Sequence, residues 1–302
     1  MKFAVTGGAG FIGSHLVKKL VREGHNVIVI DNLYRGKLSN LEGILDKVNF
    51  VKLDILDFEN LKDSIQNVDG VFHQAALTSV PESYEKEDEY KRVNVVGTEN
   101  IFKIANELQI KVVYASSSSV YGNIEKIPIT EDFSRKPINP YGQTKLDDEL
   151  LAEKFSKLGT SIIGLRYFNV FGIGQTLDYA GVITKFIEKI KEGKPPVIFG
   201  DGSQIRDFIF VEDIANANFA AMTSDMNNGF FNIGTGKSIS IKELANLMIK
   251  ISGKQLESVF ENLPPGDVKL STANISNSKK YLKWKPKISL EEGLKTLFQI
   301  KI

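Results

Sequence analysis

The most constraining feature of this chain is a glycine-rich turn that directly follows its first apolar run, residues 3–5. Gly8, Gly10 and Gly13 have the spacing G-x-G-x-x-G, and Gly7 with the last two also gives G-x-x-G-x-x-G. Glycine permits a tight turn and lets backbone N–H groups approach a pyrophosphate, and the helix expected next directs its positive end toward the same place. Glycine spacing alone is weak support, but a strand, a glycine turn and a helix in this order predict a dinucleotide-binding unit.

Asp31 ends the second apolar run, at the distance from the glycine turn where such a unit places an acidic residue. Its carboxylate can accept hydrogen bonds from ribose hydroxyls and would repel a 2′-phosphate, so it favours NAD over NADP. Arg35 lies nearby and argues weakly for the opposite preference. Asp54 follows the third apolar run and has two equally good interpretations, a contact with the adenine or a helix N-cap.

The first half of the chain alternates short apolar runs with longer amphipathic stretches. Further strands are predicted at 27–30, 48–53, 68–73, 111–116 and 161–166, and helices at 11–23, 58–66, 84–108 and 141–158. This alternation predicts an α/β fold, a Rossmann-type doubly wound parallel sheet covered on both faces. Ligands of such sheets bind beyond the carboxyl ends of the strands.

After residue 166 the alternation loosens, which indicates a second and smaller unit. Helices are expected at 181–192, 211–223 and 238–252, and a strand at 207–210. We expect the nucleotide-binding domain to comprise residues 1–166 plus about 206–231. A smaller C-terminal substrate-binding lobe is expected from about 167–205 and 232–302.

Composition excludes several classes of function. A net charge of +1 indicates no nucleic-acid partner and no attraction to an anionic membrane, and there is no apolar stretch of spanning length. The absence of cysteine and the scatter of three histidines predict no metal site. The first residues run straight into the glycine turn without the apolar stretch of a signal peptide, so a cytoplasmic protein is expected.

Tyr141 and Lys145 stand four residues apart at the start of a predicted helix and therefore share one face of it. A free tyrosine has a pKa of about 10, and a nearby ammonium lowers that value and favours the phenolate, so Tyr141 is a candidate base. Serines 116–119 follow the fifth strand and offer hydroxyls that could bind a substrate oxygen. Each pattern is common by itself, as a solvated helix face or a polar strand end, but both together behind a nucleotide fold indicate catalysis.

With these motifs the sequence resembles the extended short-chain dehydrogenase/reductase family, and within it the sugar-nucleotide 4-epimerases. The resemblance covers nearly the whole chain and is carried by residues 6–13, 73–76, 94–98, 116–122, 141–145, 166–172 and 200–208. It implies that Tyr141 is the base and Lys145 its assistant. The third catalytic member falls on Ser117, with Ser118 as the alternative if the register slips. His73 is expected to be structural.

The resemblance also assigns binding residues. Those expected to bind NAD are Gly7, Gly10, Phe11, Ile12, Gly13, Asp31, Asn32, Asp54, Ile55, Ala75, Ala76, Asn94, Tyr141, Lys145 and Tyr167. Those expected to bind a UDP-sugar substrate are Ser117, Tyr141, Asn169, Val182, Phe199, Arg206, Asp267 and Ser271. Asn169 and Arg206 would hold the diphosphate, because a guanidinium offers paired donors to phosphate. Residues 195–200 resemble the segment that receives the uracil.

The reaction is inferred from what is absent near the catalytic serine. Dehydratases and decarboxylases that resemble this chain carry an acid one or two residues after it, where this chain has Ser118 and Ser119. The sequence therefore favours an epimerase that inverts C4 of a UDP-hexose through a transient 4-keto sugar. Residues 179–183 and the small Ser271 favour UDP-GlcNAc and UDP-GalNAc, with UDP-glucose and UDP-galactose also open.

Several alternatives remain at this stage. A UDP-glucuronate 4-epimerase is disfavoured by Asn169, where those enzymes have Thr, and by the lack of arginine in 173–180. A reductase that releases its cofactor after each turnover is a second alternative, and Asp31 argues against NADP as that cofactor. A non-catalytic NAD-binding subunit is a third alternative, which is disfavoured because the chain retains Tyr141 and Lys145. Pro264 stands where the family commonly has a second phosphate-binding arginine, so Arg206 acts alone or another residue, such as Lys269, replaces it.

A homodimer is expected, because helices near 90–108 and 141–158 form a four-helix contact in the family. Ile101, Ile104, Ala105 and Leu108 give helical apolar spacing, although that stripe could equally face the sheet.

Overall fold

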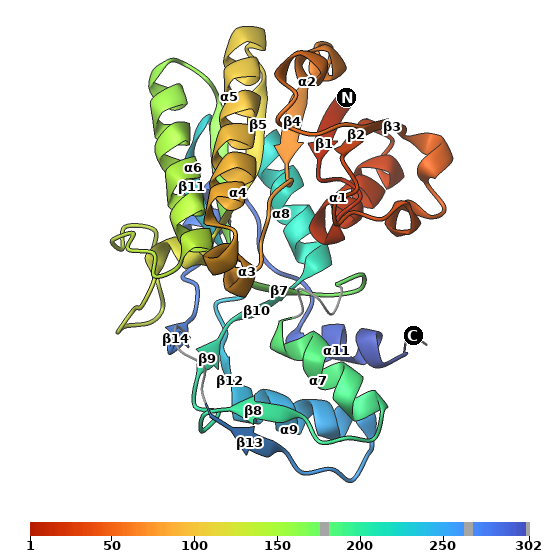
Figure 1. Cartoon of the computed structure of the whole chain (residues 1–302), viewed down its shortest axis with the longest axis vertical. Coiled ribbons are helices and arrows are strands. Elements are labelled where there is room, and N and C mark those ends of the chain that lie inside the picture. The colour runs from red at the N-terminus through yellow and green to blue at the C-terminus, as the bar shows by residue number, and fades with distance from the viewer. Residues whose placement is uncertain (176–180, 263–267, 300–302) are drawn as a thin grey trace.

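The computed structural model describes residues 1–175, 181–262 and 268–299 of the chain. Its centre is a seven-stranded sheet in the order β11-β6-β5-β4-β1-β2-β3, in which every pairing is parallel (Figure 1). The strands are β1 (Lys2–Thr6), β2 (Asn26–Asp31), β3 (Asn49–Lys52), β4 (Gly70–His73), β5 (Lys111–Ser117), β6 (Ile162–Tyr167) and β11 (Asn228–Ile233). The predicted Rossmann-type parallel sheet is confirmed.

Helices cover both faces of this sheet because successive strand residues point to opposite sides. Phe3 and Val5 of β1 belong to the core under α1 (Phe11–Arg22) and α8 (Val211–Thr223), whereas Ala4 belongs to the core on the opposite face. That second face is covered by α2 (Phe58–Ile65), α5 (Gly97–Leu108) and α6 (Pro140–Lys157). Ile101, Ile104 and Ala105 of α5 are fully buried there, so their apolar stripe faces the sheet.

The strand order reverses beside β1. From β1 the chain moves outward to β2 and β3, and then crosses back to β4 on the other side of β1. A switch of this kind opens a crevice beyond the carboxyl ends of the two central strands, where α/β proteins bind their ligands. The glycine turn, the loop after β4 and the serines after β5 all lie at that edge.

Two features of the nucleotide-binding half differ from the sequence prediction. Strand β11 was not predicted, and it adds the seventh strand by pairing with β6. The single helix expected at 84–108 is divided into α3 (Val80–Glu85), α4 (Glu87–Tyr90), a π-helical segment (Lys91–Val96) and α5. The π-helical segment contains Asn94, whose buried amide bonds to the Leu77 backbone and to Thr144. The hydrogen bonds of Asn94 to distant residues therefore occur where the helix predicted at 84–108 is interrupted.

The smaller lobe has its own apolar core, lined by Phe186, Ile190, Leu244 and Met248 among others. It contains the helices α7 (Val182–Lys191), α9 (Ile241–Ser252) and α11 (Leu290–Gln299), which lie below the sheet in Figure 1. Its short strands are β8 (Val197–Phe199), β9 (Ile205–Arg206), β12 (Ile239–Ser240), β13 (Val259–Glu261) and β14 (Leu270–Ser271).

Two segments connect the lobe to the sheet. The parallel pair β7 (Asn169–Phe171) and β10 (Phe208–Phe210) lies between the two halves, and α10 (Ser276–Tyr281) contacts β11. Trp284, late in the chain, packs into the core beneath α8. The C-terminal segment thus returns to the nucleotide-binding half, and the predicted domain boundaries stay a prediction. Within the described ranges, no helix has the length and apolar character to span a membrane.

Candidate active site

The glycine turn forms a tight cradle at the carboxyl end of β1. Gly7 has a φ of +64°, and a Cβ atom there would lie 2.7 Å from the backbone nitrogen of Ala75. Gly10 is the N-cap of α1, and no side chain caps its first turn. The turn therefore leaves backbone N–H groups at a helix N-terminus directed at open space, which suits a pyrophosphate.

A cavity of about 390 Å³ lies over this turn. The predicted NAD-binding residues that line it are Gly7, Gly10, Phe11, Ile12, Gly13, Asp31, Asn32, Asp54, Ile55, Ala75 and Ala76. The structure therefore brings together most of the predicted cofactor residues, which come from four strand ends. Their chemistry fits a dinucleotide: glycine backbone beside the phosphates and carboxylates beside the ribose.

Asp31 is held so that its carboxylate faces this cavity. One oxygen accepts from Ala9 N at 3.0 Å and the other from Leu33 N at 2.8 Å. Burial raises the pKa of Asp31, and these two backbone hydrogen bonds oppose the shift. Each carboxylate oxygen has a second lone pair, which leaves acceptor capacity for ribose hydroxyls.

Two neighbours of the cavity clarify open questions from the sequence. Asp54 accepts hydrogen bonds from Asn32 Nδ2 and Leu56 N, whereas Asp57 caps α2, so the helix-cap interpretation of Asp54 is wrong. Arg35 forms an ion pair with Glu82. Its guanidinium is therefore already engaged with an acid, which weakens the argument that it marks a 2′-phosphate site.

A second cavity, of about 570 Å³, opens beside the first. The predicted site residues that line it are Ser117, Tyr141, Lys145, Tyr167, Asn169, Val182, Phe199 and Arg206. The two cavities share Phe11, Ile12, Gln74, Ala76, Thr78 and Gln175 as lining residues. A cofactor in the first cavity and a substrate in the second would therefore meet at this common wall.

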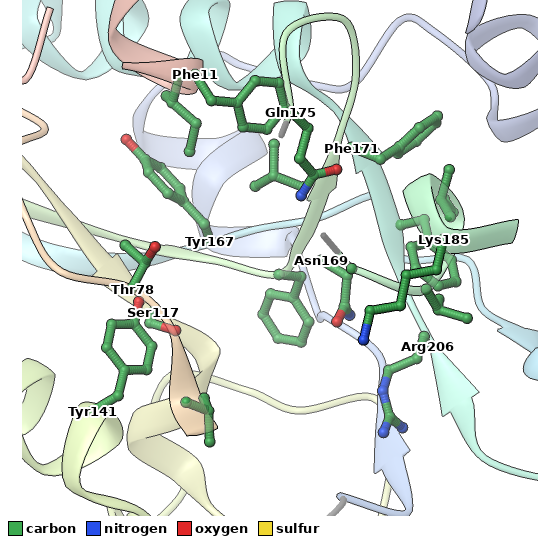
Figure 2. Close-up of a pocket in the computed structure, with 18 of the residues that line it drawn as sticks. Phe11, Thr78, Ser117, Tyr141, Tyr167, Asn169, Phe171, Gln175, Lys185 and Arg206 are labelled. Carbon is green, nitrogen blue, oxygen red and sulfur yellow. The ribbon is translucent and has the colours of Figure 1, made fainter. Parts of the chain in front are cut away.

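Tyr141 enters the second cavity from the first turn of α6. Asn139 caps this helix by accepting from Gly142 N at 2.8 Å, and Pro140 occupies the first helical position. The phenol points toward Ser117 and Thr78 (Figure 2). Three hydroxyl groups from separate elements thus gather at one end of the cavity.

Two serines of the run, Ser116 and Ser117, line the cavity, whereas Ser118 does not. Ser116 Oγ already donates to Glu149, and Ser117 ends β5. Ser117 Oγ donates to Ser119 Oγ at 3.1 Å and accepts from Ser119 N at 3.1 Å. The geometry therefore favours Ser117 over Ser118 as the hydroxyl that meets a substrate.

Lys145 lies one helical turn after Tyr141 and is buried, with its Nζ 3.1 Å from Asp148 Oδ2. His73 is buried close by between two hydroxyls, with Nδ1 2.7 Å from Thr6 Oγ1 and Nε2 2.9 Å from Thr98 Oγ1. Burial lowers the pKa of His73 to about 3, and Lys145 adds to the shift. The imidazole therefore stays neutral at physiological pH and occupies a structural position.

Two predicted cofactor residues have different surroundings. Tyr167 lines the second cavity, and its hydroxyl is bound to Gln74 and Asn218. Burial raises the pKa of Tyr167, so its phenol remains protonated. Asn94 lines neither cavity, because its amide is used to hold the Leu77 backbone against α6.

On the other side of the cavity, Asn169, Lys185 and Arg206 converge (Figure 2). Asn169 Nδ2 donates to the Asp207 carbonyl at 3.0 Å, which fixes the amide at the start of β7. Ser271 pairs in register with Arg206 between β14 and β9 but is not a lining residue of the cavity. Asp267, like Tyr179 and Pro264, lies outside the described residues.

Thr78, Gln175 and Lys185 are lining residues that the sequence did not single out. Thr78 follows β4 at the carboxyl edge of the sheet, so the rule for ligand sites in parallel sheets was a usable signal. Lys185 is one of several lysines on α7 and carries no such signal. Among the described residues, no cluster of His, Asp or Glu is arranged to hold a metal ion.

Comparisons with known proteins identify the family of this chain. A family model described as NAD dependent epimerase/dehydratase matches residues 3–234. A putative UDP-glucose 4-epimerase from Methanocaldococcus jannaschii is 39% identical over 96% of this chain and 95% of its own length.

Two solved structures have the same overall fold. A UDP-N-acetylglucosamine 4-epimerase from Methanobrevibacter ruminantium, in complex with UDP-N-acetylmuramic acid, has a TM-score of 0.93 at 39% identity, over 97% of this chain and 96% of that one. A UDP-glucose 4-epimerase from Thermotoga maritima, with UDP-glucose, has a TM-score of 0.93 at 37% identity, over 98% and 96%.

Proposed function

Because the chain belongs to the NAD-dependent epimerase/dehydratase family, we propose that it is a UDP-sugar 4-epimerase that inverts C4 of a hexose through a transient 4-keto sugar. One observation carries the choice of epimerase. Ser117, Tyr141 and Lys145 line one cavity, and none of its described lining residues is Asp or Glu. Epimerisation needs one base, whereas a dehydratase or decarboxylase needs a further acid.

NAD, when bound, supplies a reversible hydride acceptor at the common wall of the two cavities. The chain's residues manage the proton. Tyr141 Oη takes it from the sugar 4-hydroxyl as the C4–H bond breaks, and the Lys145 ammonium favours the phenolate that this step requires. Ser117 Oγ donates to the same sugar oxygen. After the sugar turns about its diphosphate link, Tyr141 returns the proton and C4 is inverted.

Asn169, Lys185 and Arg206 are proposed to hold the diphosphate, at the side of the cavity away from Tyr141 (Figure 2). Arg206 offers paired donors and Lys185 a compact positive charge. No acid among the described residues forms an ion pair with Lys185, so its ammonium is available to an anion. Lys185 thereby supplies the second positive charge for the diphosphate, in place of the arginine that the family commonly has at position 264.

Phe199 and Val182, which lie on β8 and α7, are proposed to receive the uracil. Phe199 is 40% exposed although it is aromatic, which leaves surface for a planar base. The preferred substrates are proposed to be UDP-GlcNAc and UDP-GalNAc, or UDP-glucose and UDP-galactose. UDP-glucuronate is the alternative substrate, and experiment must distinguish it from these four sugar nucleotides.

The test is to incubate the purified protein with UDP-GlcNAc, UDP-glucose and UDP-glucuronate separately and to follow each sugar by proton NMR. Appearance of the 4-epimer supports the proposal, and the relative rates identify the sugar. Accumulation of NADH would indicate a reductase instead. Tight NAD binding without conversion of any sugar would indicate a non-catalytic subunit.

Tyr141→Phe is expected to lower kcat by a factor of about 10²–10⁴ or more, because the phenolate is lost. NAD affinity should change little. Tyr84→Phe is the matched control, because Tyr84 is 58% exposed and lines neither cavity. Substantial turnover by the Tyr141 variant would overturn the assignment of the base.

Lys185→Ala is expected to weaken binding of UDP by roughly tenfold, since a hydrogen bond between charged groups is lost. Binding of uridine should be unchanged, because uridine has no phosphate. Lys189→Ala, one turn later on α7 and outside both cavities, is the control. Calorimetric titration with UDP and with uridine measures both, and an equal loss for the two ligands would contradict a phosphate contact.

A homodimer is also proposed. The apolar stripe of α5 that contains Ile101 faces the sheet, so the dimer contact must use other residues. Val96, which directly precedes α5, is 46% exposed, and Leu150 of α6 is 49% exposed. Sedimentation at low concentration should show a dimer that Leu150→Glu weakens. A wild-type monomer at micromolar concentration would exclude this proposal.

A further inference from the structure

Behind the catalytic face of α6 lies a buried acid that the mechanism above does not use. Asp148 stands three residues after Lys145, and its side chain has no exposed surface. Lys145 Nζ donates to its Oδ2 at 3.1 Å. Its Oδ1 is buried and has no hydrogen-bond partner within the described part of the chain. Asp148 is therefore a carboxyl group with one satisfied oxygen and one unsatisfied oxygen.

The surroundings of Asp148 come from four elements. Helix α6 contributes Lys145 and the neighbouring Asp147, and α5 contributes the Thr98 hydroxyl. Strand β4 contributes the neutral His73, which is bonded to Thr98, and β5 contributes the buried phenol of Tyr114. Lys145 is thus the only cation among the described groups that act on Asp148.

An unsatisfied, fully buried carboxyl oxygen costs stability, and packing alone would be served as well by an apolar side chain. Asp148 Oδ2 accepts its hydrogen bond from Lys145, which lines the same cavity as Tyr141, and the Thr98 hydroxyl acts on the same carboxyl group. Burial raises the pKa of Asp148 to about 7, with the Lys145 ammonium opposing the shift. Asp148 therefore changes charge near neutral pH.

We propose that Asp148 is a positioning residue for Lys145, whose buried carboxyl group fixes the ammonium and sets how strongly its charge acts on Tyr141. The proposal rests on the proposed function only in taking Tyr141 as the base. Ionised Asp148 partly cancels the field of the ammonium and so disfavours the phenolate. Protonated Asp148 leaves that field intact and favours it.

Two further consequences follow from this arrangement. Asp148 and Tyr141 share one cation and become negative on deprotonation, so ionisation of either hinders ionisation of the other. The phenolate should therefore titrate over a broader pH range than a single independent group. A carboxyl group that only fills space would leave the tyrosine titration sharp.

The test compares Asp148→Asn with the wild type. The amide keeps an oxygen that accepts from Lys145 but cannot become negative. The acid limb of the kcat profile should move to lower pH by about 0.5–1.5 units, with KM for the sugar nucleotide unchanged within about twofold. Asp147→Asn removes a charge from the adjacent position, where the carboxylate bonds to Gln143 and is the weakest of the groups that act on Asp148, so it should move the limb by much less than Asp148→Asn does.

A second readout does not depend on turnover. The ultraviolet absorbance of the phenolate, taken as wild type minus Tyr141→Phe, reports ionisation of Tyr141 in the NAD-bound protein. The expected curve is broad in the wild type, and sharper and shifted to lower pH in the Asp148→Asn background. A sharp wild-type curve overturns the proposal even if the Asn variant fails to fold, and so do superimposable curves with and without Asp148. If no sugar is epimerised, this titration still decides the role of Asp148, so the two failures are distinguishable.

Discussion

Two buried polar clusters lie side by side along α6 and are built in opposite ways. The lysine cluster consists of Thr98, Lys145 and Asp148, and the arginine cluster of Ser116, Arg135, Glu149 and Arg166 together with Tyr121. Asp148 and Glu149 are consecutive in the chain and equally buried. What differs is how completely the neighbouring residues satisfy each carboxyl group.

Glu149 is fully satisfied. Arg166 donates to both of its oxygens, from Nε and Nη2 at 2.8 Å each, in a bidentate pair. Ser116 Oγ donates at 2.7 Å and Arg135 Nη1 at 3.0 Å. Arg166 in turn donates from Nη1 to the Tyr121 hydroxyl at 2.7 Å. A network in which no buried side-chain nitrogen or oxygen lacks a partner holds β5, β6 and α6 together.

The lysine cluster is incomplete where the arginine cluster is complete. Asp148 Oδ2 accepts from Lys145 while its Oδ1 has no hydrogen-bond partner, and Lys145 lines the same cavity as Tyr141. The comparison teaches that burial of a carboxylate does not by itself indicate a structural role. A saturated network fixes the scaffold, whereas an unsaturated one remains able to change charge.

Among substitutions that distinguish the two clusters, Glu149→Gln is expected to have the largest effect on stability. Removing the charge leaves Arg166 buried without its anion, so the free energy of unfolding should fall by about 3–5 kcal/mol. Urea unfolding at neutral pH measures this loss. The fraction that remains folded should keep its pH profile, because the ion pairs of Glu149 are with Arg135 and Arg166 and that of Lys145 is with Asp148. A loss below about 1 kcal/mol would mean that the arginine cluster is not the stabilising one.

A smaller and pH-dependent effect is expected from Asp148→Asn. The pKa of Asp148 is raised in the folded protein to about 7, so the folded state binds the proton more tightly than the unfolded state. The stabilisation from this proton is present at low pH and is lost as pH rises toward the folded pKa. The difference in unfolding free energy, wild type minus variant, should fall by roughly 1–3 kcal/mol between about pH 4 and about pH 7.

Urea unfolding at several pH values measures that difference, with Asp147→Asn as the control whose difference should change much less with pH, because Asp147 is the weakest of the groups that act on Asp148. A difference that rises with pH would show that Asp148 is a stabilised carboxylate like its neighbour. Both clusters would then stabilise an ionised carboxylate, and the distinction between them would fail.

The smallest effect is expected from Arg135→Met, which keeps apolar packing against Phe230 but removes one donor to Glu149. Arg135 is 24% exposed, and Glu149 keeps its bonds to Arg166 and Ser116. The loss in unfolding free energy should be about 1 kcal/mol. Thermal unfolding measures it, and a loss as large as that of Glu149→Gln would show that the network fails as a unit.

The sequence was sufficient for the parts of this protein that depend on local pattern. The glycine spacing predicted the phosphate cradle, and the apolar runs predicted six of the seven strands of the sheet. Strand β11 escaped because Asn228 and Gly229 begin it and only a short apolar run follows. The spacing of Tyr141 and Lys145 predicted a shared helix face, and the structure places both side chains in one cavity.

Other features depend on residues that are distant along the chain. Nothing in the order Asp147, Asp148, Glu149 indicates which acid is solvated, which is saturated by arginine and which bonds to Lys145. Lys185 and Arg206 line one cavity only because the fold places α7 and β9 around it.

The sequence by itself thus determined the nucleotide fold and the shared helix face of Tyr141 and Lys145, because both follow from strand period, helix period and glycine conformation. The tertiary structure alone decided the partners of each buried charge. Those partners come from β4, β5, β6 and α5, and the strength of an electrostatic interaction depends on distance and burial in space rather than on separation along the chain.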